Sequence, residues 1–338
     1  MLARTHPPGS CPLMSGFPVH FLSCTSHHPW MNSPSYTTLF ASGTLALRVE
    51  QAASLLSSCT VCPRRCGVDR TRDERGYCGG GLLPAVSSYG PHFGEEPPLV
   101  GRYGSGTIFF TGCNMRCIFC QNYEISQARH GVDVSPGRLA GMMLELQERR
   151  CHNINLVSPS HFVPQILQAV LIAAEKGLVI PLVYNTGTYD SAETLRLLEG
   201  VIDIYMPDAK YGREEIARTL SDAPGYPALM QEAILEMQRQ VGDLVVRDGV
   251  AEQGLIIRHL VLPRELAGSD LVMQFIGERV SREAYVNIMD QYHWNSSVSS
   301  PDFIEKYPGF EALLRGITEE EYGYAIRCAR KYGLHRGF

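Results

Sequence analysis

Residues 106–122, with the sequence GTIFFTGCNMRCIFCQN, decide the fold that we expect for this chain of 338 residues. The β-branched and aromatic run at 107–110 predicts a buried strand, which the following Thr-Gly pair ends. Three cysteines come next, Cys113, Cys117 and Cys120, spaced C-x3-C-x2-C on a loop. Thiolates at such short spacing suit an iron–sulfur cluster, and three of them leave one iron of a [4Fe–4S] cube without a protein ligand. An open coordination position predicts chemistry at the metal, because structural sites are closed by four ligands.

This motif resembles that of the radical S-adenosylmethionine (SAM) enzymes, in which Cys-x3-Cys-x-aromatic-Cys follows a strand and Phe119 is the aromatic residue. With Gln121 and Asn122 directly after the last cysteine, it is similar to the branch homologous to pyruvate formate-lyase activating enzyme. In that family the open iron chelates the amino and carboxylate groups of SAM. Reduction of the cluster then releases a 5′-deoxyadenosyl radical, which abstracts hydrogen from a substrate. A zinc site or three buried thiols are the plainer alternatives for the cysteines taken alone.

The composition is that of an ordinary globular protein, with 44% hydrophobic and 19% charged residues. The net charge of −5 provides no basic field, so we expect no nucleic-acid partner. The longest apolar run, at 166–174, is far shorter than the ~20 residues that a membrane-spanning helix needs. We therefore expect no membrane partner either.

The cysteines indicate the cellular compartment. The chain has eleven of them, and seven lie in two tight clusters. An odd number gathered in this way is typical of metal binding in a reducing cytosol and not of a secreted disulfide framework. We expect a cytoplasmic protein.

Three regions are expected along the chain. Residues 1–34 are rich in Pro, Ser, His and Gly and contain no acidic residue, which predicts a disordered leader; a shorter protein beginning at Met31 is one explanation. Residues 35–100 form an N-terminal segment with a second group of cysteines. Residues 101–338 form the core expected from the resemblance, which covers residues 35–334 and ends in a helix.

The second group of cysteines consists of Cys59, Cys62, Cys66 and Cys78. The spacing C-x2-C-x3-C-x11-C supplies four thiolates from two turn-rich stretches, which is typical of a metal site. Zinc would make it a closed structural site, whereas a second iron–sulfur cluster would make it an electron relay. Unmetallated thiols are the third possibility, and the sequence does not separate the three.

Strands and helices alternate after the three-cysteine loop, which predicts a parallel α/β sheet with right-handed crossovers. Further strands are expected at 153–157, 180–184, 201–206, 254–262 and 284–289. Helices are expected at 44–57, from Ser135-Pro136, at 164–177, after a capping box at Asp190 and Glu193, and at 213–220, 228–241 and 269–280. A second capping box, at Thr318 and Glu321, predicts the last helix at 318–332. The family's fold is a partial (β/α)6 barrel of the TIM type, and the count of six strands agrees. In such barrels the functional residues lie at the carboxyl ends of the strands.

Asp208 and Lys210 follow the fourth predicted strand and alternate onto the same face. The family places Asp-x-Lys here to orient SAM; a purely structural ion pair is the alternative. His293, after the sixth strand, falls where activating enzymes have a SAM-contacting histidine, although it also suits a surface residue. The resemblance further implies that Phe119 lies against the adenine.

Other strand ends carry polar residues with two interpretations each. Ser158 and Ser160 stand where activating enzymes usually have Gly-Gly-Glu-Pro, which contacts the SAM amino group, and they would equally serve as a helix cap. Asn185 would meet the ribose or methionine end of SAM, or form a turn. Arg258 and His259 would hold the SAM carboxylate or a substrate anion, or serve packing alone.

The resemblance implies an enzyme that receives electrons from a donor such as flavodoxin or ferredoxin. Its partner would be a glycyl radical enzyme, from whose glycine the hydrogen is taken. One alternative is a radical SAM enzyme that acts on a small molecule or modifies another protein. A second is a non-catalytic iron–sulfur or zinc scaffold, in which SAM would not be cleaved.

Overall fold

The protein is described here by a computed structural model that covers residues 33–294, 298 and 302–338. The leader expected at 1–34 and the alternative start at Met31 therefore fall almost entirely outside the described residues. Within the described chain, no helix is long and apolar enough to cross a membrane.

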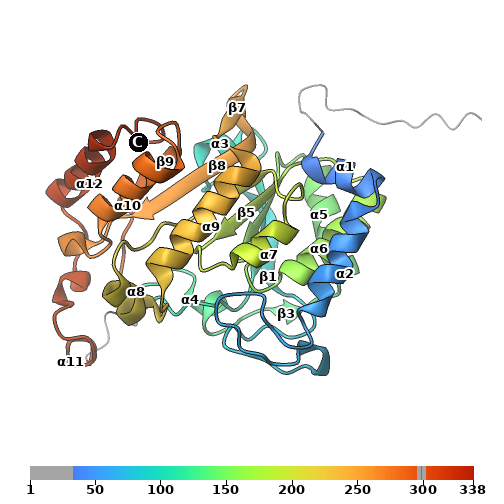
Figure 1. Cartoon of the computed structure of the whole chain (residues 1–338), viewed down its shortest axis with the longest axis horizontal. Coiled ribbons are helices and arrows are strands. Elements are labelled where there is room, and N and C mark those ends of the chain that lie inside the picture. Colours follow the sequence, from blue (N-terminus) through green and yellow to red (C-terminus); the bar gives the residue numbers. More distant parts are fainter. Residues whose placement is uncertain (1–32, 295–297, 299–301) are drawn as a thin grey trace, which may run out of the picture. The chain divides into compact units, whose positions relative to one another are not determined.

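The centre of the fold is a mixed β-sheet, in which six neighbouring strands of the described chain run parallel (Figure 1). In sheet order these are β2 (Ser105–Phe110), β4 (Ile154–Val157), β5 (Leu182–Thr186), β6 (Ile204–Pro207), β8 (Val250–Leu260) and β9 (Tyr285–Met289). They correspond to the six predicted strands, with ends displaced by up to four residues. Among the described residues, no strand pairing joins β9 to the opposite edge, so hydrogen bonds do not close the sheet into a barrel.

Three antiparallel strands, none of them predicted, extend the sheet. They are β1 (Ala85–His92) beside β2, β3 (Val132–Asp133) beside β1, and β7 (Val245–Arg247) beside β8. The sequence of β1, AVSSYGPH, contains Gly and Pro, and only Val86 of the strand is fully buried. It forms a strand because it pairs along the exposed edge of β2, which its own apolar pattern does not reveal.

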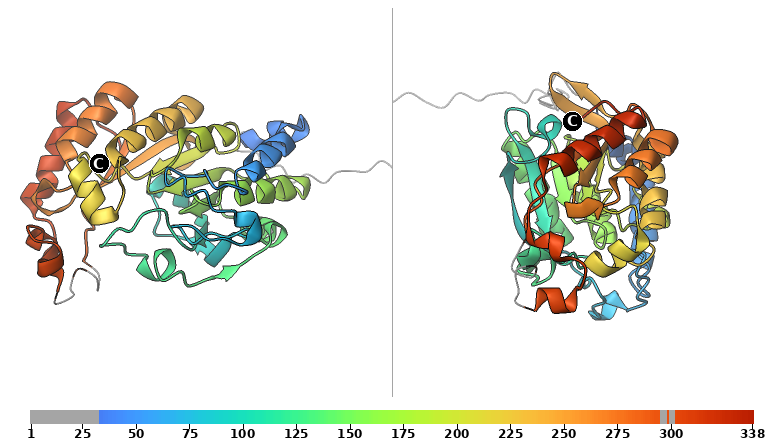
Figure 2. Two further views of the ribbon diagram at one scale, coloured as in Figure 1. Left: turned by 60° about the horizontal axis from the view of Figure 1, so that its bottom comes forward. Right: turned by 90° about the vertical axis from the view of Figure 1, so that its left-hand side faces the viewer.

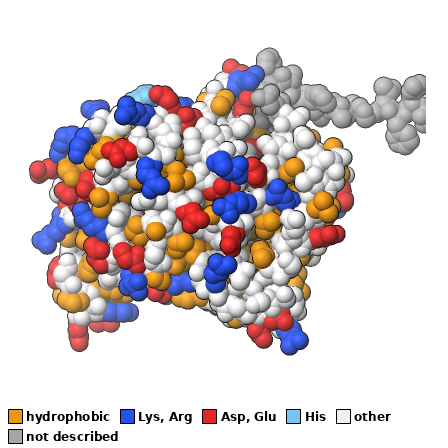
Figure 3. All heavy atoms as spheres, in the orientation of Figure 1, with side chains coloured by type: hydrophobic (Ala, Val, Ile, Leu, Met, Phe, Trp, Pro, Cys, Tyr) orange, Lys and Arg blue, Asp and Glu red, His pale blue; other side chains and the backbone are white. Residues whose placement is uncertain are grey.

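Helices of the described chain lie around the sheet (Figure 1). They are α1 (Ser35–Ala41), α2 (Thr44–Ser54), α4 (Tyr123–Ser126), α5 (Pro136–Glu148), α6 (Val163–Glu175), α7 (Ala192–Leu197), α8 (Glu214–Ser221), α9 (Tyr226–Val241), α10 (Ser269–Phe275), α11 (Phe303–Lys306) and α12 (Glu319–Lys331). The N-terminal pair α1 and α2 packs on α6, which packs on α5, while α10 and α12 lie at the other end of the molecule (Figures 1 and 2). Acidic and basic side chains alternate over the face shown in Figure 3.

A short helix, α3 (Pro97–Val100), packs against the inner face of the sheet near the amino ends of its parallel strands. Its Leu99 is fully buried against Val183, Ile204 and Ile256 of three parallel strands. The amide of Asn153, at the start of β4, donates a 2.9 Å hydrogen bond to the Leu99 carbonyl. The helix α3 therefore covers the amino-terminal part of this face.

Two local predictions fared differently. Thr318 and Glu321 form the capping box expected at the start of α12. The box expected at Asp190 is wrong, because that carboxylate is buried and accepts hydrogen bonds from the hydroxyls of Tyr184 and Thr186 instead. Ser191 takes the N-cap position of α7 without a side-chain bond.

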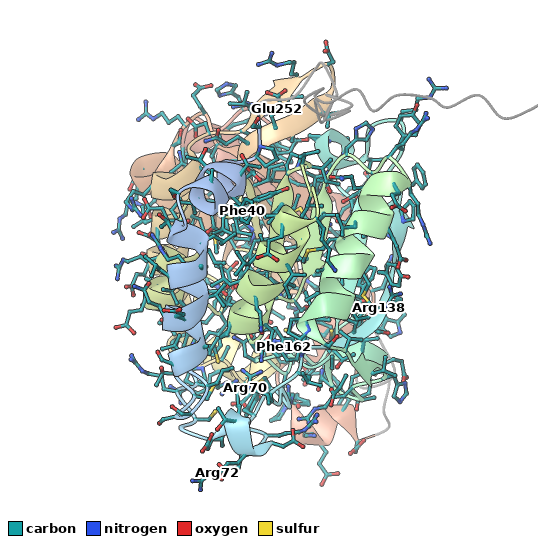
Figure 4. All side chains as sticks on the ribbon, turned by 90° about the vertical axis from the view of Figure 1, so that its right-hand side faces the viewer. Phe40, Arg70, Arg72, Arg138, Phe162 and Glu252 are labelled. Atoms are coloured by element: carbon teal, nitrogen blue, oxygen red, sulfur yellow. The ribbon has the colours of Figure 1, made fainter. Side chains whose placement is uncertain are left out.

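The stretch 55–84 is largely irregular and is fixed by a buried arginine, Arg70. Its guanidinium donates to the carbonyls of Gly81 (2.9 Å) and His161 (2.7 Å), and it lies 5.5 Å from the ring centre of Phe162 (Figure 4). A buried charge with several carbonyl partners is costly to lose, so Arg70 ties the four-cysteine stretch to the start of α6.

Candidate functional site

The three-cysteine loop leaves the carboxyl end of β2 through Gly112, whose φ of +78° favours glycine. A Cβ atom at this position would lie 2.3 Å from the carbonyl oxygen of Cys78, so the loop also requires glycine for its close approach to the N-terminal segment. Cys113, Cys117 and Cys120 follow, all of them partly buried. The loop therefore begins in direct backbone contact with the four-cysteine stretch.

The middle of this loop is held by the end of α8. The backbone N–H groups of Arg116 and Ile118 donate to the carbonyls of Ser221 (2.8 Å) and Leu220 (2.9 Å). The Ser221 hydroxyl donates to the sulfur of Cys117 at 3.0 Å. Two backbone bonds and one side-chain bond thus fix the loop to an element that lies about a hundred residues further along the chain.

The thiols of the loop lie in a desolvated, mutually repulsive setting. Burial, followed by the charges of Cys117 and Cys120, raises the pKa of Cys113 to about 12. Burial likewise raises the pKa of Cys117, against the opposing charge of Lys210. Thiols in this state ionise when a metal supplies the compensating positive charge.

This donor set fits an iron–sulfur cube. Within the described residues, no three His, Cys, Asp or Glu side chains are placed to hold one metal ion. A [4Fe–4S] cube makes a different demand, because each thiolate ligates a different iron. Three interacting thiols on one loop can bind three irons and leave the fourth open.

A charged group lies beside the loop, at the carboxyl ends of β6 and β8. Lys210 donates to one oxygen of Asp208 at 2.7 Å, and Arg258 donates to the other oxygen from Nε at 2.7 Å. Arg258 also donates to the side-chain oxygen of Asn185 at 2.8 Å. Lys210 and Asp208 both interact electrostatically with Cys117, which places this group near the three-cysteine loop. The predicted face-sharing of Asp208 and Lys210 is confirmed.

The charges in this group stabilise one another. Burial alone would raise the pKa of Asp208, but the charges of Arg258 and Lys210 outweigh it and hold the pKa below its usual range. Burial would lower the pKa of Lys210, yet Asp208 raises it. All three side chains remain charged at neutral pH, so two cations and one anion face the loop.

Ser158 and Asn185 lie together at neighbouring strand ends. The Ser158 N–H donates to the Asn185 carbonyl at 2.9 Å, and Ser158 has a φ of +58°, which is unfavourable for a residue with a side chain. Strained backbone of this kind is concentrated at functional sites. The structure therefore brings four of the six predicted SAM residues together: Ser158, Asn185, Asp208 and Lys210.

Three other predicted residues are His259, Phe119 and His293. His259 faces away from Arg258, is fully buried, and bonds the Ala209 carbonyl (2.7 Å) and Ser269 Oγ (2.8 Å). Burial lowers its pKa to about 4, so it is neutral, and of the two interpretations given for His259 its contacts agree with packing and not with anion binding. Phe119 is buried edge-on against Tyr292, with ring centres 5.7 Å apart. His293 is exposed.

Sequence reasoning missed three residues of this region. The Tyr226 hydroxyl lies 2.7 Å from the Asp208 carbonyl and 2.9 Å from that of Gly187, so it fixes two strand ends. Asn287 donates to both carboxylate oxygens of Glu96 at 2.9 and 2.8 Å, and burial raises the pKa of Glu96. Tyr226 and Asn287 belong to no sequence motif. The third missed residue, Ser221, likewise carries no sequence feature that points to Cys117.

Comparison with known proteins bears on this geometry. The family model described as "Radical SAM superfamily" matches residues 107–246, which include most of β2, the three-cysteine loop, Asp208 and Lys210. The chain is also 32% identical over 302 residues to "Uncharacterized protein MJ0674" of Methanocaldococcus jannaschii. That similarity covers 86% of this chain and 79% of the relative.

Proposed function

Because the chain belongs to the radical SAM superfamily, we propose that it is an activating enzyme that uses SAM to abstract hydrogen from a glycyl radical enzyme. The superfamily implies an enzyme with a [4Fe–4S] cluster and SAM. When bound, these supply one electron and a sulfonium, whose cleavage gives methionine and a 5′-deoxyadenosyl radical. The protein binds the cluster and SAM, orients them, and excludes water from the site.

The observation that supports this proposal is that Lys210 and Asp208 lie close enough to Cys117 to change its pKa, while Arg258 is held on the same carboxylate of Asp208. Cys113, Cys117 and Cys120 would hold three irons of the cube. Lys210 and Arg258 would bind the carboxylate of SAM, since both are cations with further donor hydrogens.

Asp208 serves this group by holding both cations. Its two oxygens are already engaged by Lys210 and Arg258, so it fixes their direction before SAM arrives. Such preorganisation removes the cost of ordering two long side chains during binding. Ser158 and Asn185 would meet the amino and ribose parts of SAM, Phe119 the adenine, and His293 the same ligand from the end of β9.

A polypeptide substrate is supported by the open edge of the sheet. In the described chain, the strands do not close between β9 and β1. We take this break in the strand pairing as the place where a protein loop would enter. A small molecule as substrate is the alternative, and the same site would serve it.

The test is SAM cleavage by the anaerobically reconstituted protein with dithionite. We expect 5′-deoxyadenosine and methionine from the wild type and from Cys151→Ala, and none from Cys117→Ala. Intact SAM in the wild-type assay would refute the enzymatic proposal. Turnover that leaves no glycyl radical signal on any glycyl radical enzyme offered would assign the chemistry to another substrate.

A further inference from the structure

The thiols of Cys59, Cys62, Cys66 and Cys78 are brought together by the fold. The side chain of Cys66 hydrogen-bonds that of Cys59, and both Cys62 and Cys66 interact electrostatically with Cys59 and Cys78. Three of the four are buried, and Cys66 alone is exposed. The four cysteines therefore form one group, which the sequence spacing alone did not establish.

These thiols share a local geometry with the three-cysteine loop. The backbone N–H two residues further along donates to the sulfur at Cys62, at Cys66 and, over 3.4 Å, at Cys78. At Cys113 the N–H of Met115 does the same over 3.4 Å. N–H groups directed at sulfur stabilise thiolate and tune iron–sulfur centres. The turn after Cys113 thus repeats the turns after Cys62, Cys66 and Cys78.

One side chain touches both groups. Asn114 hydrogen-bonds the thiol of Cys62, and its Oδ1 lies 4.0 Å from the sulfur of Cys113. The Asn114 amide is held in place by a 2.6 Å bond to the Tyr189 carbonyl. A single fixed residue therefore separates a thiol of the first group from a thiol of the second.

We propose that Cys59, Cys62, Cys66 and Cys78 hold a second iron–sulfur cluster, joined to the three-cysteine loop through Asn114. Tetrahedral zinc needs its four sulfurs gathered about 2.3 Å from one point. In the described chain neither cysteine group gathers three thiols around one ion, whereas a cluster distributes its thiolates over several irons. The position beside the loop is the one that an electron relay requires.

This inference does not require that SAM be cleaved, so its test is metal content and spectroscopy. We would reconstitute the full-length protein anaerobically and measure iron, sulfide and zinc per chain, with electron paramagnetic resonance after dithionite reduction. We expect wild-type iron clearly above the four atoms of one cube, about eight if both centres are cubes. A wild type with four irons and one zinc would overturn the proposal.

Two variants separate the centres. Cys113→Ala/Cys117→Ala/Cys120→Ala should retain iron and a resonance signal from the four-cysteine group, and its loss of all iron would contradict the proposal. Cys62→Ala/Cys66→Ala should lower the iron to about four per chain. If the wild-type three-cysteine loop binds no cube but Cys113→Ala/Cys117→Ala/Cys120→Ala keeps its iron, the proposed function is wrong and this inference stands.

Asn114→Ala tests the connection between the two groups. The iron content should stay at the wild-type value, and the reduction potential of the four-cysteine centre should fall, since a hydrogen bond to sulfur favours the reduced, more negative state. An unchanged potential would show that Asn114 does not join the centres. Circular dichroism melting of each variant verifies that it folds.

Discussion

The Nε atom of Arg64 donates a 3.0 Å hydrogen bond to the carbonyl oxygen of Asn114. The same guanidinium lies 3.7 Å from the ring centre of Tyr77, whose other neighbour is Arg116 at 4.3 Å. One basic side chain after Cys62 thus supports the residue after Cys113. The shape of the three-cysteine loop therefore depends on the N-terminal segment as well as on β2.

Arg64→Ala should loosen this loop. The variant loses the bond to Asn114 and the stacking on Tyr77, which together should cost about 2 kcal/mol of unfolding free energy. Urea unfolding measures the cost, and the loop thiols of the metal-free variant should react faster with a thiol reagent. Arg65→Ala is the matched control: its exposed pair with Glu193 should contribute under about 1 kcal/mol. Equal effects at the two positions would contradict the role of Arg64.

Asp208→Asn should damage both stability and SAM binding. The amide leaves Lys210 and Arg258 without their counter-charge, and breaking a mostly buried pair costs about 3 kcal/mol. The SAM dissociation constant should rise at least about tenfold, which corresponds to about 1.4 kcal/mol. Asp133→Asn, which breaks an exposed pair with Arg75, should change neither quantity appreciably. Unchanged SAM affinity in Asp208→Asn would remove this group from the site.

Ser221→Ala should shift the potential of the loop cluster to more negative values without loss of iron. The hydroxyl donates to Cys117, and this hydrogen bond favours the reduced cluster. A redox titration followed by electron paramagnetic resonance measures the shift. Tyr211→Phe is the control, because it removes the 2.6 Å bond between the Tyr211 and Ser221 hydroxyls but keeps the Ser221 donor. A shift of the same size in Tyr211→Phe would point to a general change in packing.

Asp203 should make stability depend on pH. Burial raises the pKa of this carboxyl to about 6, although it accepts bonds from the N–H groups of Ser35 and Leu182. Between the ordinary pKa of an aspartate and pH 6, the folded state binds more protons than the unfolded state. The contribution of Asp203 to the free energy of unfolding therefore rises as the pH falls and is lost as the pH rises through 6.

The measurement is the difference in unfolding free energy between wild type and Asp203→Asn, because other groups cancel. The wild type should gain about 2 kcal/mol relative to the variant from pH 7 to pH 4.5. A difference that is flat across this range would show that Asp203 titrates normally.

The sequence predicted what local patterns determine. Alternating apolar segments gave the six parallel strands, and the spacing of Asp208 and Lys210 gave a shared face. It did not predict β1, because that strand depends on the edge of β2 and not on its own residues. Nor did it separate Arg258 from His259, since successive strand residues point to opposite faces and only the assembled sheet shows which face is inner. The contact of Asn114 with Cys62 joins residues 52 positions apart, and no local pattern contains it.

The bonds from Arg116 and Ile118 to the end of α8 have a consequence for biogenesis. A ribosome completes the cysteines of the loop long before it reaches Leu220 and Ser221. A nascent chain that stops before Leu220 contains all three cysteines of the loop but lacks the two carbonyl groups that hold the loop in shape. Insertion of iron and sulfide in the cell should therefore follow release of at least the first 221 residues from the exit tunnel.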